Sequence, residues 1–363
     1  MLKMFLQNVL FPNAYSLWTF VYRNETPKFI IFADSHHAKL PYSMERIHNE
    51  IISRGHEIID EIYDFTQMSA LRSVLVSLRF MRLYARARYV FICDNFLPVS
   101  SCRKRKETTV VQLMHSCGLF KKMGYDTTED IPEGYKGEVY RNYDLVTVSA
   151  PACIEPLQSA MHLPSGVVKA LGVSRTDNYF DPTWIRNCKD RFYKDYPELK
   201  NKKIILWAPT FRGNAGNPHL VGSEAITQLE KELEDGYFVL KKIHPHADKI
   251  YKLSNCDIPT EELFPVVDLL ISDYSSVVNE FMFFDKPYML FAPDLQEFEK
   301  VRGFYVPYDT LTPYVCIEGE NLREVLSKAL SDKQPDWVAD KRAYHLSACD
   351  GQVTGKILEY LNL

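Results

Sequence analysis

Short apolar runs alternate with amphipathic stretches along almost the whole chain. KFIIFADS (28–35) and YVFICDN (89–95) are strand-like runs that end in polar residues, and YSMERIHNEIISRG (42–55) between them has helical periodicity. The pattern restarts at KKIILWAPT (202–210). Such alternation is expected of parallel strands joined by crossover helices. The sequence therefore predicts an α/β fold of two Rossmann-like, doubly wound domains that face each other across a cleft.

The length of the chain also favours two domains, since 363 residues exceed one ordinary hydrophobic core. The turn-rich stretch LGVSRTDNYFDPTW (171–184) separates the two series of alternating elements and is typical of an interdomain connection. We expect an N-terminal domain over 1–178 and a C-terminal domain over 179–335. We expect a C-terminal helix over 336–363 that packs back on the first domain.

Composition excludes several classes of protein. A formal net charge of -4 argues against a dedicated nucleic-acid binder. The eight cysteines form no CxxC pair, which argues against a zinc ribbon or a redox motif and fits the reducing cytoplasm. No apolar run reaches the roughly 18 to 20 residues that span a bilayer. The apolar segment 1–22 is compatible with a helix lying on a membrane surface and equally with a helix packed on the first domain.

Basic residues concentrate between positions 70 and 106. A long helix is expected over 69–88, and four of its arginines fall within about 80° of one another at about 100° per residue. A short basic run follows this helix. Together these side chains predict a surface that contacts an anionic membrane or an anionic acceptor. They are Arg72, Arg79, Arg82 and Arg86 on the helix, and Arg103, Lys104, Arg105 and Lys106 in the run.

Polar side chains stand at the carboxyl ends of several predicted strands, where ligands of doubly wound sheets bind. His115 follows the strand at 108–114, and His244 follows the strand at 237–243. Packing alone does not require this set of polar strand ends, which predicts a ligand site. The remaining members are Thr210 and Arg212 after 202–208, and Asp273, Ser275 and Ser276 after 266–272.

The stretch SDYSS (272–276) fits an anion site. Ser275 and Ser276 open a helix whose free N–H groups and dipole favour a phosphate, although a simple helix cap is the commoner explanation of such a stretch. Arg212 stands in the glycine-rich loop FRGNAGN (211–217) and suits a diphosphate clamp, or else is an ordinary surface arginine. The sequence alone leaves both pairs of alternatives open.

The remaining candidates concern proton transfer and the nucleotide. The imidazole of His115 is suited to take a proton from an attacking hydroxyl, and the backbone of His244 is held extended by Pro245. Each histidine is also compatible with a structural role. Glu280 can reach a ribose hydroxyl or can be a solvated residue on a helix face. No Asp-x-Asp signature occurs, so neither a metal nor another cofactor is predicted.

Six blocks follow one another along the chain: VVQLMHSCGLFKKMG (110–124), ALGVSRTDNYF (170–180), IILWAPTFRG (204–213), VLKKIHPHA (239–247), DLLISDYSSVVNEFMFFDKPYMLFAPD (268–294) and RGFYVPY (302–308). In this order, they resemble the CDP-glycerol glycerophosphotransferase family of teichoic-acid and capsule synthesis. A seventh stretch, DGQVTGKILEYL (350–361), resembles the closing block of that family. The resemblance covers roughly 105–361, and the first hundred residues are generic.

The resemblance implies a GT-B-like fold with the nucleotide in the C-terminal domain and the acceptor on the N-terminal domain. It implies transfer of a polyol phosphate from CDP-glycerol or CDP-ribitol to a hydroxyl of a lipid-linked saccharide or polyol-phosphate polymer. CMP is released, and the site of action is the cytoplasmic face of the membrane. The residue roles it implies are His115 as general base, His244 as stabiliser of the donor phosphates, Thr210, Arg212, Ser275 and Ser276 at the phosphates, Glu280 on the nucleotide side, and Arg302 near the donor.

Two departures from the family pattern stand out. Met114-His115-Ser116 replaces the usual Trp-His-Gly, and Ser174 replaces the usual Pro before the Arg-x-Asp turn that begins at Arg175. Both histidines are retained, so the altered flanks concern the fit of the acceptor. The rival hypotheses are a GT-B glycosyltransferase that uses a nucleotide sugar and a catalytically inactive scaffold bound to the membrane.

Overall fold

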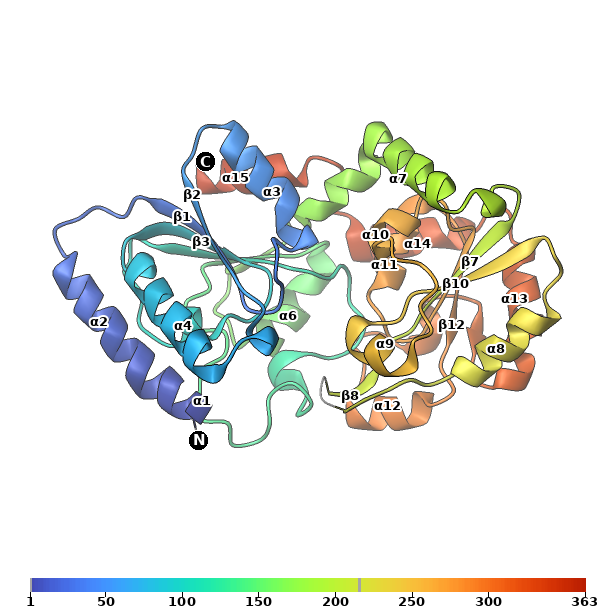
Figure 1. Cartoon of the computed structure of the whole chain (residues 1–363), viewed down its shortest axis with the longest axis horizontal. Helices are drawn as coiled ribbons and strands as arrows, with labels where there is room; N and C mark the ends of the chain where they lie inside the picture. Colours follow the sequence, from blue (N-terminus) through green and yellow to red (C-terminus); the bar gives the residue numbers. More distant parts are fainter. Residues whose placement is uncertain (1, 215–216) are drawn as a thin grey trace. The chain divides into compact units, whose positions relative to one another are not determined.

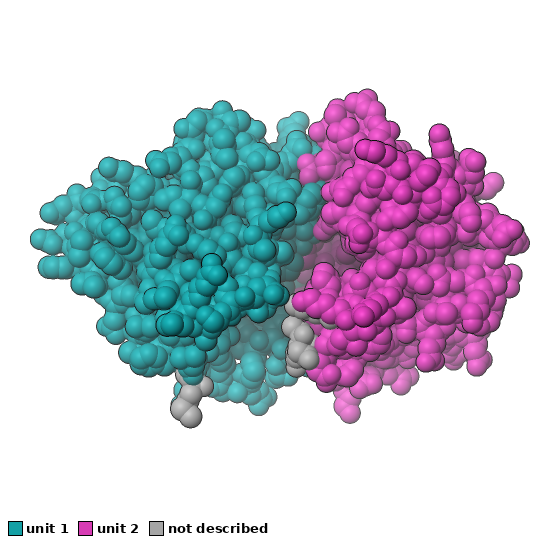
Figure 2. Space-filling view, in the orientation of Figure 1, with its two compact units in different colours: residues 1–115, 123–177, 348–363 teal, residues 116–122, 178–347 magenta. Residues whose placement is uncertain are grey.

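The computed structural model describes residues 2–214 and 217–363. The chain forms two compact units, shown in two colours in Figure 2. Unit 1 comprises residues 1–115, 123–177 and 348–363, and unit 2 comprises residues 116–122 and 178–347. Ala215 and Gly216, which belong to the stretch FRGNAGN (211–217), lie outside the described residues.

Unit 1 is built on a six-stranded parallel sheet with the strand order β2-β1-β3-β4-β5-β6. The inner strands β1, β3 and β4 are largely buried on both faces, as expected of a parallel sheet covered by helices. Phe32 and Phe91 stack across neighbouring strands with their ring centroids 4.8 Å apart. The strands are β1 (Phe29–Asp34), β2 (Ile58–Ile62), β3 (Ala87–Ile92), β4 (Thr109–Leu113), β5 (Leu145–Thr147) and β6 (Val168–Lys169).

Several helices of unit 1 pack in pairs. The N-terminal helix α2 (Phe11–Val21) lies along α4 (Ala70–Tyr84), and α15 (Val353–Leu361) contacts α3 (Tyr42–Ser53), as Figure 1 shows. Phe11 and Tyr15 of α2 are buried in this packing, and the ring of Tyr15 lies 5.0 Å from that of Tyr84. The segment before α2 forms α1 (Leu2–Phe5) and a short π-helix (Leu6–Leu10), and the smaller helices of the unit are α5 (Leu97–Ser100) and α6 (Ile154–Ala160).

Unit 2 is built on a five-stranded parallel sheet with the order β10-β7-β11-β12-β13. Its core includes Trp207, which is almost fully buried although it is the largest side chain there. A small antiparallel hairpin, β8 (Arg212–Asn214) and β9 (Asn217–His219), follows β7. The sheet strands are β7 (Lys203–Ala208), β10 (Tyr237–Lys241), β11 (Leu269–Ser272), β12 (Tyr288–Phe291) and β13 (Val315–Cys316).

The helices of unit 2 alternate with these strands along the chain. They are α7 (Pro182–Asp195), α8 (Ser223–Glu232), α9 (Pro245–Tyr251), α10 (Thr260–Leu263), α11 (Val277–Phe281), α12 (Leu295–Val301), α13 (Leu322–Ser331) and α14 (Asp336–Leu346). Figure 1 shows them around the sheet of this unit. The two parallel sheets confirm the predicted α/β fold of two doubly wound domains.

The units depart from the predicted domain boundaries at the C-terminus, where two helices replace the one expected over 336–363. Helix α14 belongs to unit 2 because it packs on α11 and because Arg342 donates a hydrogen bond to Asp285. Helix α15 belongs to unit 1, where the carboxylate of Asp177 accepts hydrogen bonds from the backbone N–H groups of Val353 and Thr354 at 2.9 and 2.8 Å. A carboxylate at a helix N-terminus satisfies free N–H groups and complements the helix dipole.

Residues 116–122 are the second departure, because they belong to unit 2 although they follow β4 of unit 1. Asn279 donates a hydrogen bond to the carbonyl of Cys117 at 2.8 Å, and the backbone N–H of Leu119 donates to Nδ1 of His345 at 3.2 Å. Gly118 has a φ of +69°, and a Cβ atom there would lie 2.5 Å from the side chain of Asn279. Glycine is therefore required at this position both for its backbone conformation and for the close approach of Asn279.

Candidate functional site

The donor-site candidates of unit 2 lie around the point where the direction of the sheet reverses. Strand β10 adjoins one edge of β7, and β11 adjoins the other. Ligands of open α/β sheets bind beside the carboxyl ends of the strands at such a switch point. Thr210 follows β7 and Asp273 follows β11, so the structure brings these two predicted residues together.

Asp273 ties the two strand ends to each other. Its Oδ1 accepts hydrogen bonds from the backbone N–H groups of Thr210 and Tyr274, at 2.7 and 2.5 Å, and its Oδ2 accepts one from Arg212 at 2.9 Å. The residue is only 2% exposed. Asp273 therefore fixes the segment after β7, which contains Thr210 and Arg212, against the end of β11.

Arg212 is engaged by two carboxylates. Its Nε and Nη2 donate to the two oxygens of Asp294 at 2.6 and 2.9 Å, and its Nη1 donates to Asp273 and to the carbonyl of Thr210. Its guanidinium also lies over the ring of Tyr274, 4.6 Å from the centroid. The sequence left open a diphosphate clamp and an ordinary surface arginine, and the structure gives a largely buried arginine at the start of a hairpin rather than an exposed one. Most of its donors are used by protein groups.

Three side-chain hydroxyls at the switch point donate no hydrogen bond to another described residue. Ser276 precedes α11 without any side-chain capping bond, and the Oγ of Ser275 accepts only a long hydrogen bond, 3.4 Å, from the N–H of Val277. The Oγ1 of Thr210 is buried and has no hydrogen-bond partner. A buried hydroxyl without a partner costs free energy unless a ligand supplies the hydrogen bond. Helix capping therefore does not account for these side chains.

Glu280 is buried rather than solvated. Its Oε2 accepts a hydrogen bond from the hydroxyl of Tyr179 at 2.6 Å. The alternative of a solvated helix-face residue is therefore wrong. Tyr179 comes from the turn-rich stretch before α7, so a residue 101 positions away fixes the direction of this carboxylate.

Two further predicted residues of unit 2 lie in other settings. The side chain of His244 is exposed at the start of α9, with its ring 4.7 Å from that of Phe211. Arg302 donates from Nε to the carbonyl of Lys122 at 3.0 Å, and the N–H of Lys122 donates to the carbonyl of Gly303. Arg302 thus fastens the segment 116–122 within unit 2.

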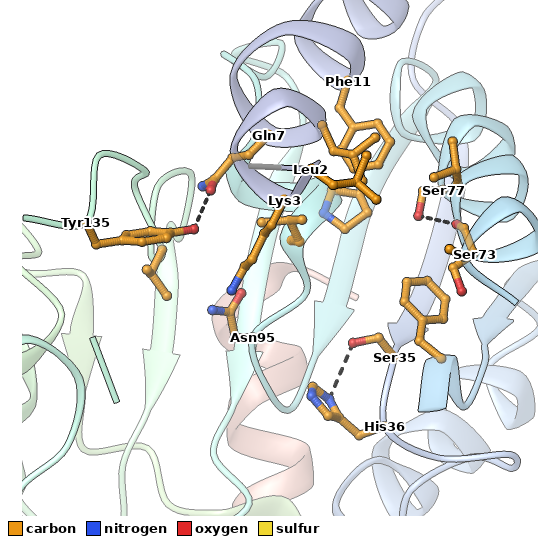
Figure 3. A pocket seen from close by; sticks show the side chains of 17 residues that line it. Leu2, Lys3, Gln7, Phe11, Ser35, His36, Ser73, Ser77, Asn95 and Tyr135 are labelled. Atoms are coloured by element: carbon orange, nitrogen blue, oxygen red, sulfur yellow. Dashed lines mark hydrogen bonds between the residues drawn. The ribbon is translucent and has the colours of Figure 1, made fainter. Parts of the chain in front are cut away.

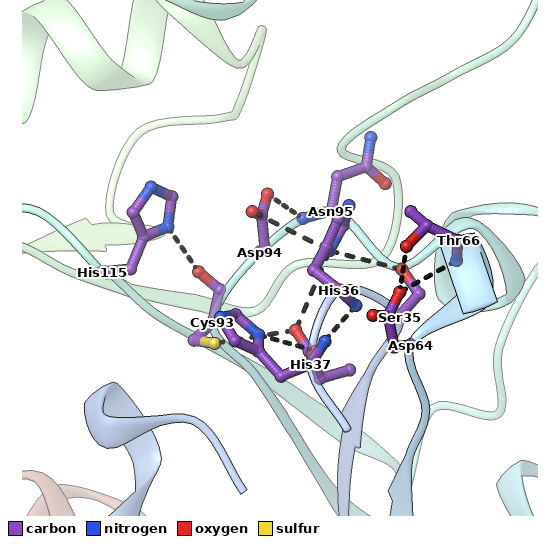
Figure 4. Close-up of polar contacts among 10 residues, drawn as sticks. Ser35, His36, His37, Asp64, Thr66, Cys93, Asp94, Asn95 and His115 are labelled. Atoms are coloured by element: carbon purple, nitrogen blue, oxygen red, sulfur yellow. Dashed lines mark hydrogen bonds and ion pairs between the residues drawn. The ribbon is translucent and has the colours of Figure 1, made fainter. Parts of the chain in front are cut away.

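His115 lies at the end of β4 in unit 1, with an exposed side chain (Figure 4). Its Nδ1 is 2.8 Å from the carbonyl oxygen of Cys93. Because a carbonyl only accepts hydrogen bonds, Nδ1 carries the hydrogen and Nε2 holds the lone pair. The ring is therefore oriented and in the tautomer that a general base requires.

Most side chains of the predicted basic surface form ion pairs or hydrogen bonds with other residues of unit 1. Arg79 pairs with Glu61 at 3.0 Å, Arg86 pairs with Glu25 at 2.8 Å, and Lys104 pairs with Asp144 at 3.0 Å. For three of the predicted side chains, no hydrogen bond or ion pair is present within the described part of the chain: Arg72, Arg103 and Lys106.

The other two predicted cations hold the N-terminal helix. Arg82 donates to the hydroxyl of Tyr22 at 2.8 Å and lies over the ring of Trp18. Arg105 donates to the backbone carbonyls of Tyr22 and Glu25. These contacts explain why the N-terminal helix is packed on unit 1, one of the two alternatives that the sequence left open.

Two features of the sites are not singled out by the sequence reasoning. Asp294, which pairs with Arg212, stands at the end of the strand-like run KPYMLFAPD, where the pattern marks it only as a boundary. The polar residues from Asp34, the last residue of β1, to His37 also stand at a strand end. Both Asp294 and the stretch from Asp34 to His37 carry the signal that identifies the other candidates, a polar side chain at the end of an apolar run.

Comparison with known proteins gives the family. Residues 17–363 match the sequence profile described as CDP-Glycerol:Poly(glycerophosphate) glycerophosphotransferase. The chain belongs to this family.

Curated relatives of the family are enzymes of teichoic acid synthesis. The chain is 35% identical over 254 residues to a teichoic acid ribitol-phosphate primase of Bacillus spizizenii. This match covers 64% of this chain and 64% of the primase. It is 32% identical over 306 residues to a teichoic acid poly(ribitol-phosphate) polymerase of the same organism, covering 78% of this chain and 48% of the polymerase. The matched part is thus less than two thirds of the length of either relative.

Solved structures show the same fold at low sequence identity. The wall teichoic acid polymerase TagF matches with a TM-score of 0.74 at 19% identity, over 97% of this chain and 93% of that chain. A histidine-to-asparagine variant of TagF soaked with CDPG matches with a TM-score of 0.75 at 20% identity, over 97% and 92%. A UDP-GlcNAc 2-epimerase from Neisseria meningitidis bound to UDP-GlcNAc gives 0.57 at 14% identity, over 92% and 99%. These likenesses establish the fold, which is GT-B-like.

Proposed function

We propose that the protein transfers glycerol phosphate or ribitol phosphate from a CDP-linked polyol to an acceptor hydroxyl in teichoic-acid or capsule synthesis. Membership of the family and the primase and polymerase relatives support this activity. The observation that carries it is the set of uncommitted hydroxyls at the switch point of unit 2: Thr210, Ser275 and Ser276.

The donor diphosphate fits this set of hydroxyls. Phosphate oxygens accept hydrogen bonds, and each hydroxyl there has a hydrogen to donate. Arg212 places a guanidinium beside them, where it is paired with Asp273 and Asp294. Glu280, held by Tyr179, is an acceptor for ribose hydroxyls, and exposed His244 adds a donor for the phosphates. Phosphoryl transfer depends mainly on such positioning and charge neutralisation.

His115 serves as the general base in this proposal. An acceptor hydroxyl oxygen attacks the phosphorus that bears the polyol, the bond from that phosphorus to the CMP oxygen breaks, and the hydroxyl proton passes to Nε2 of His115. The hydrogen bond from Nδ1 to the carbonyl of Cys93 leaves Nε2 free for this proton. No cofactor is required for these steps.

The proposal places the enzyme on the inner face of the membrane with a lipid-linked saccharide or polyol-phosphate acceptor. No helix among the described residues is long and apolar enough to span a membrane. The N-terminal helices and the start of α4 nevertheless expose large apolar side chains, the most exposed being Phe20 at 65% and Leu71 at 70%. Exposed apolar side chains on a helix favour contact with the interface of a bilayer. The others in these helices are Leu2, Phe5, Val9, Leu17, Val21 and Leu75.

Donor binding tests the proposal directly. Thermal unfolding of the purified protein is followed with CDP-glycerol, CDP-ribitol, CMP or UDP-GlcNAc. A ligand that binds the folded state raises the unfolding temperature, so we expect a rise with the CDP-linked polyols that exceeds any rise with UDP-GlcNAc. Stabilisation by UDP-GlcNAc alone would support the rival nucleotide-sugar glycosyltransferase and overturn the proposal. A protein that no donor stabilises would instead be a scaffold.

A further inference from the structure

The sheet of unit 1 has its own switch point, between β1 and β3. Strand β2 adjoins one edge of β1 and β3 adjoins the other, so the chain reverses direction across the sheet at this place. Polar residues gather at the carboxyl ends of both strands (Figure 4). We refer to five of them as the switch-point cluster: Asp34, His36, His37, Asp94 and Asn95.

Asp34 is the fixed centre of this cluster. It is 1% exposed, and its Oδ2 accepts hydrogen bonds from the backbone N–H groups of His36 and His37, both at 2.8 Å. The same oxygen accepts a hydrogen bond from Nδ1 of His37 at 2.9 Å. Burial by itself would raise the pKa of Asp34, but the hydrogen bonds from the two histidines outweigh burial and hold the pKa below its usual range.

The two histidines point their remaining nitrogens outward. Because a carboxylate only accepts, the hydrogen on Nδ1 of His37 is fixed toward Asp34. The Nε2 atoms of His36 and His37 have no hydrogen-bond partner in the described part of the chain, and both side chains are about half exposed. This Asp–His arrangement orients an imidazole toward a ligand, as carboxylates do behind catalytic histidines.

Asn95 supplies an independent sign of a missing ligand. Its Oδ1 is buried and has no hydrogen-bond partner. Asn95, Ser35 and His36 also line a cavity of about 370 Å³ that extends beneath the N-terminal helix, shown in Figure 3. The cluster therefore has unused polar atoms, and the cavity provides room beside His36 and Asn95.

The donors, acceptors and charges of the cluster favour a ligand that carries hydroxyl groups. Asp94 adds a second carboxylate, 42% exposed, whose Oδ2 lies 3.9 Å from Nδ1 of His36. The carboxylates of Asp34 and Asp94 repel a phosphate, and the hydrogen bonds to Asp34 that raise the pKa of His36 and of His37 hold the positive charge of these imidazoles within the cluster. No set of three or more His, Cys, Asp or Glu residues in residues 2–214 and 217–363 is arranged to hold a metal ion. A hydroxyl both donates and accepts, so it matches carboxylate, amide and imidazole in either protonation state.

We propose that the switch-point cluster binds the polyol end of the acceptor, with His37, oriented by Asp34, hydrogen-bonding an acceptor hydroxyl through Nε2. This inference rests on the proposed function for the identity of the acceptor. The ligand class is a chain or ring with adjacent hydroxyls, such as a terminal glycerol or ribitol unit. His37 is thereby a specificity residue on the acceptor side, distinct from the donor hydroxyls of unit 2.

The test uses histidine-selective ¹⁵N NMR of the full-length protein with glycerol 3-phosphate, ribitol and inorganic phosphate as probes. We expect glycerol 3-phosphate and ribitol to shift the Nε2 resonance of His37 and inorganic phosphate to leave it unchanged. An equal shift with inorganic phosphate would show an anion site and overturn the proposal. Unchanged His37 resonances at saturating polyol would overturn it as well.

Kinetics of CMP release with glycerol 3-phosphate as acceptor give a second readout. His37→Ala should raise the acceptor KM roughly tenfold, the value of one hydrogen bond to a polar ligand, with little change in kcat. His37→Gln, whose amide reaches the position of Nε2, should raise it less. His56→Gln, an exposed histidine in the turn after α3, is the matched control and should leave the KM unchanged.

Different results would contradict the role of His37 and the proposed function. If the wild-type protein releases CMP from CDP-glycerol but His37→Ala has an unaltered acceptor KM, the role of His37 is wrong and the proposed function stands. If the wild-type protein neither binds nor uses a CDP-linked polyol, the proposed function is wrong. The NMR titration then still decides whether the cluster binds hydroxyls.

Discussion

Arg212 and Asp294 form a bidentate ion pair at the switch point of unit 2, with Nε and Nη2 donating to the two carboxylate oxygens at 2.6 and 2.9 Å. The side chain of Arg212 is 14% exposed, and Asp273 accepts a further hydrogen bond from its guanidinium. Parallel N–H donors are the geometry with which arginine also binds phosphate. The pair therefore keeps the guanidinium oriented beside the donor-site hydroxyls.

Removal of Arg212 should destabilise the protein strongly. Arg212→Met leaves Asp273 and Asp294 without their cation, and breaking a buried ion pair in this way costs roughly 3–5 kcal/mol. The free energy of unfolding from urea denaturation measures the loss. The matched control is Arg323→Met, which removes an exposed pair with Glu232 at 3.8 Å. If both variants lose the same small amount of stability, Arg212 is not the electrostatic centre of these loops.

Thr210 offers a substitution that separates ligand binding from folding. Its Oγ1 is buried without a partner, so Thr210→Val should leave the free energy of unfolding unchanged or raise it. Donor affinity should fall about tenfold because a hydrogen bond to phosphate is lost. Calorimetric titration with CDP-glycerol measures this. Thr147→Val in unit 1, which also removes a buried unpartnered hydroxyl, is the control and should bind the donor like the wild-type protein. Equal affinities in all three proteins would exclude Thr210 from the donor site.

His345 predicts a pH dependence of stability. Burial lowers the pKa of this imidazole to about 4, with a smaller contribution from Lys341. Since the unfolded chain takes up the proton near the ordinary histidine value, the contribution to stability is complete above that value. It is lost as the pH falls toward 4. Between pH 7.5 and 5, the wild-type protein should lose about 2 kcal/mol more than His345→Asn.

Asparagine keeps an acceptor near the position of Nδ1, so the hydrogen bond from Leu119 can persist in this variant while the titration is removed. Urea denaturation of both proteins across the pH range gives the comparison. Parallel pH profiles would mean that His345 is not held neutral in the folded state.

The apolar face of the N-terminal helices should bind membranes. Phe20→Ser and Leu17→Ser each remove an exposed apolar side chain from α2 and should weaken binding to vesicles that contain anionic lipid, each by severalfold. Ile317→Ser, a comparably exposed apolar residue in unit 2, is the control. Most predicted basic residues are paired within unit 1, so added salt should reduce binding only partly. Identical binding of all variants would place the membrane contact elsewhere.

The fold was predictable because its signal is local. Apolar runs such as 28–35 and 202–210 and the helical period of 42–55 each lie within one element, and the structure places β1, β7 and α3 there. The same holds for the polar strand ends, since Thr210 and Asp273 follow neighbouring strands as the alternation implied. These features depend on periodicity and on the geometry of parallel sheets.

The pairings that shape the sites were not predictable, because they join distant segments. Asp294 lies 82 positions from Arg212, and Asn279 lies 162 positions from the carbonyl of Cys117 that it holds. Arg79 of α4 and Arg86, which follows that helix, looked like parts of a free basic face because helical spacing does not reveal Glu61 or Glu25 as their partners. The sequence can indicate which residues stand at a sheet edge, but the choice of partner is decided by tertiary packing.

Acceptor-dependent release of CMP by wild-type protein and by His115→Asn tests the central claim most directly. The amide of the introduced asparagine can still donate to the carbonyl of Cys93, so the variant keeps the local hydrogen bond and lacks the base. With CDP-glycerol or CDP-ribitol and a polyol-phosphate acceptor, we expect the wild-type protein to release CMP. We expect the variant to bind the donor normally and to release CMP at a rate lower by about 100-fold or more. Full activity of the variant, or wild-type protein that releases no CMP from either donor, would contradict the account.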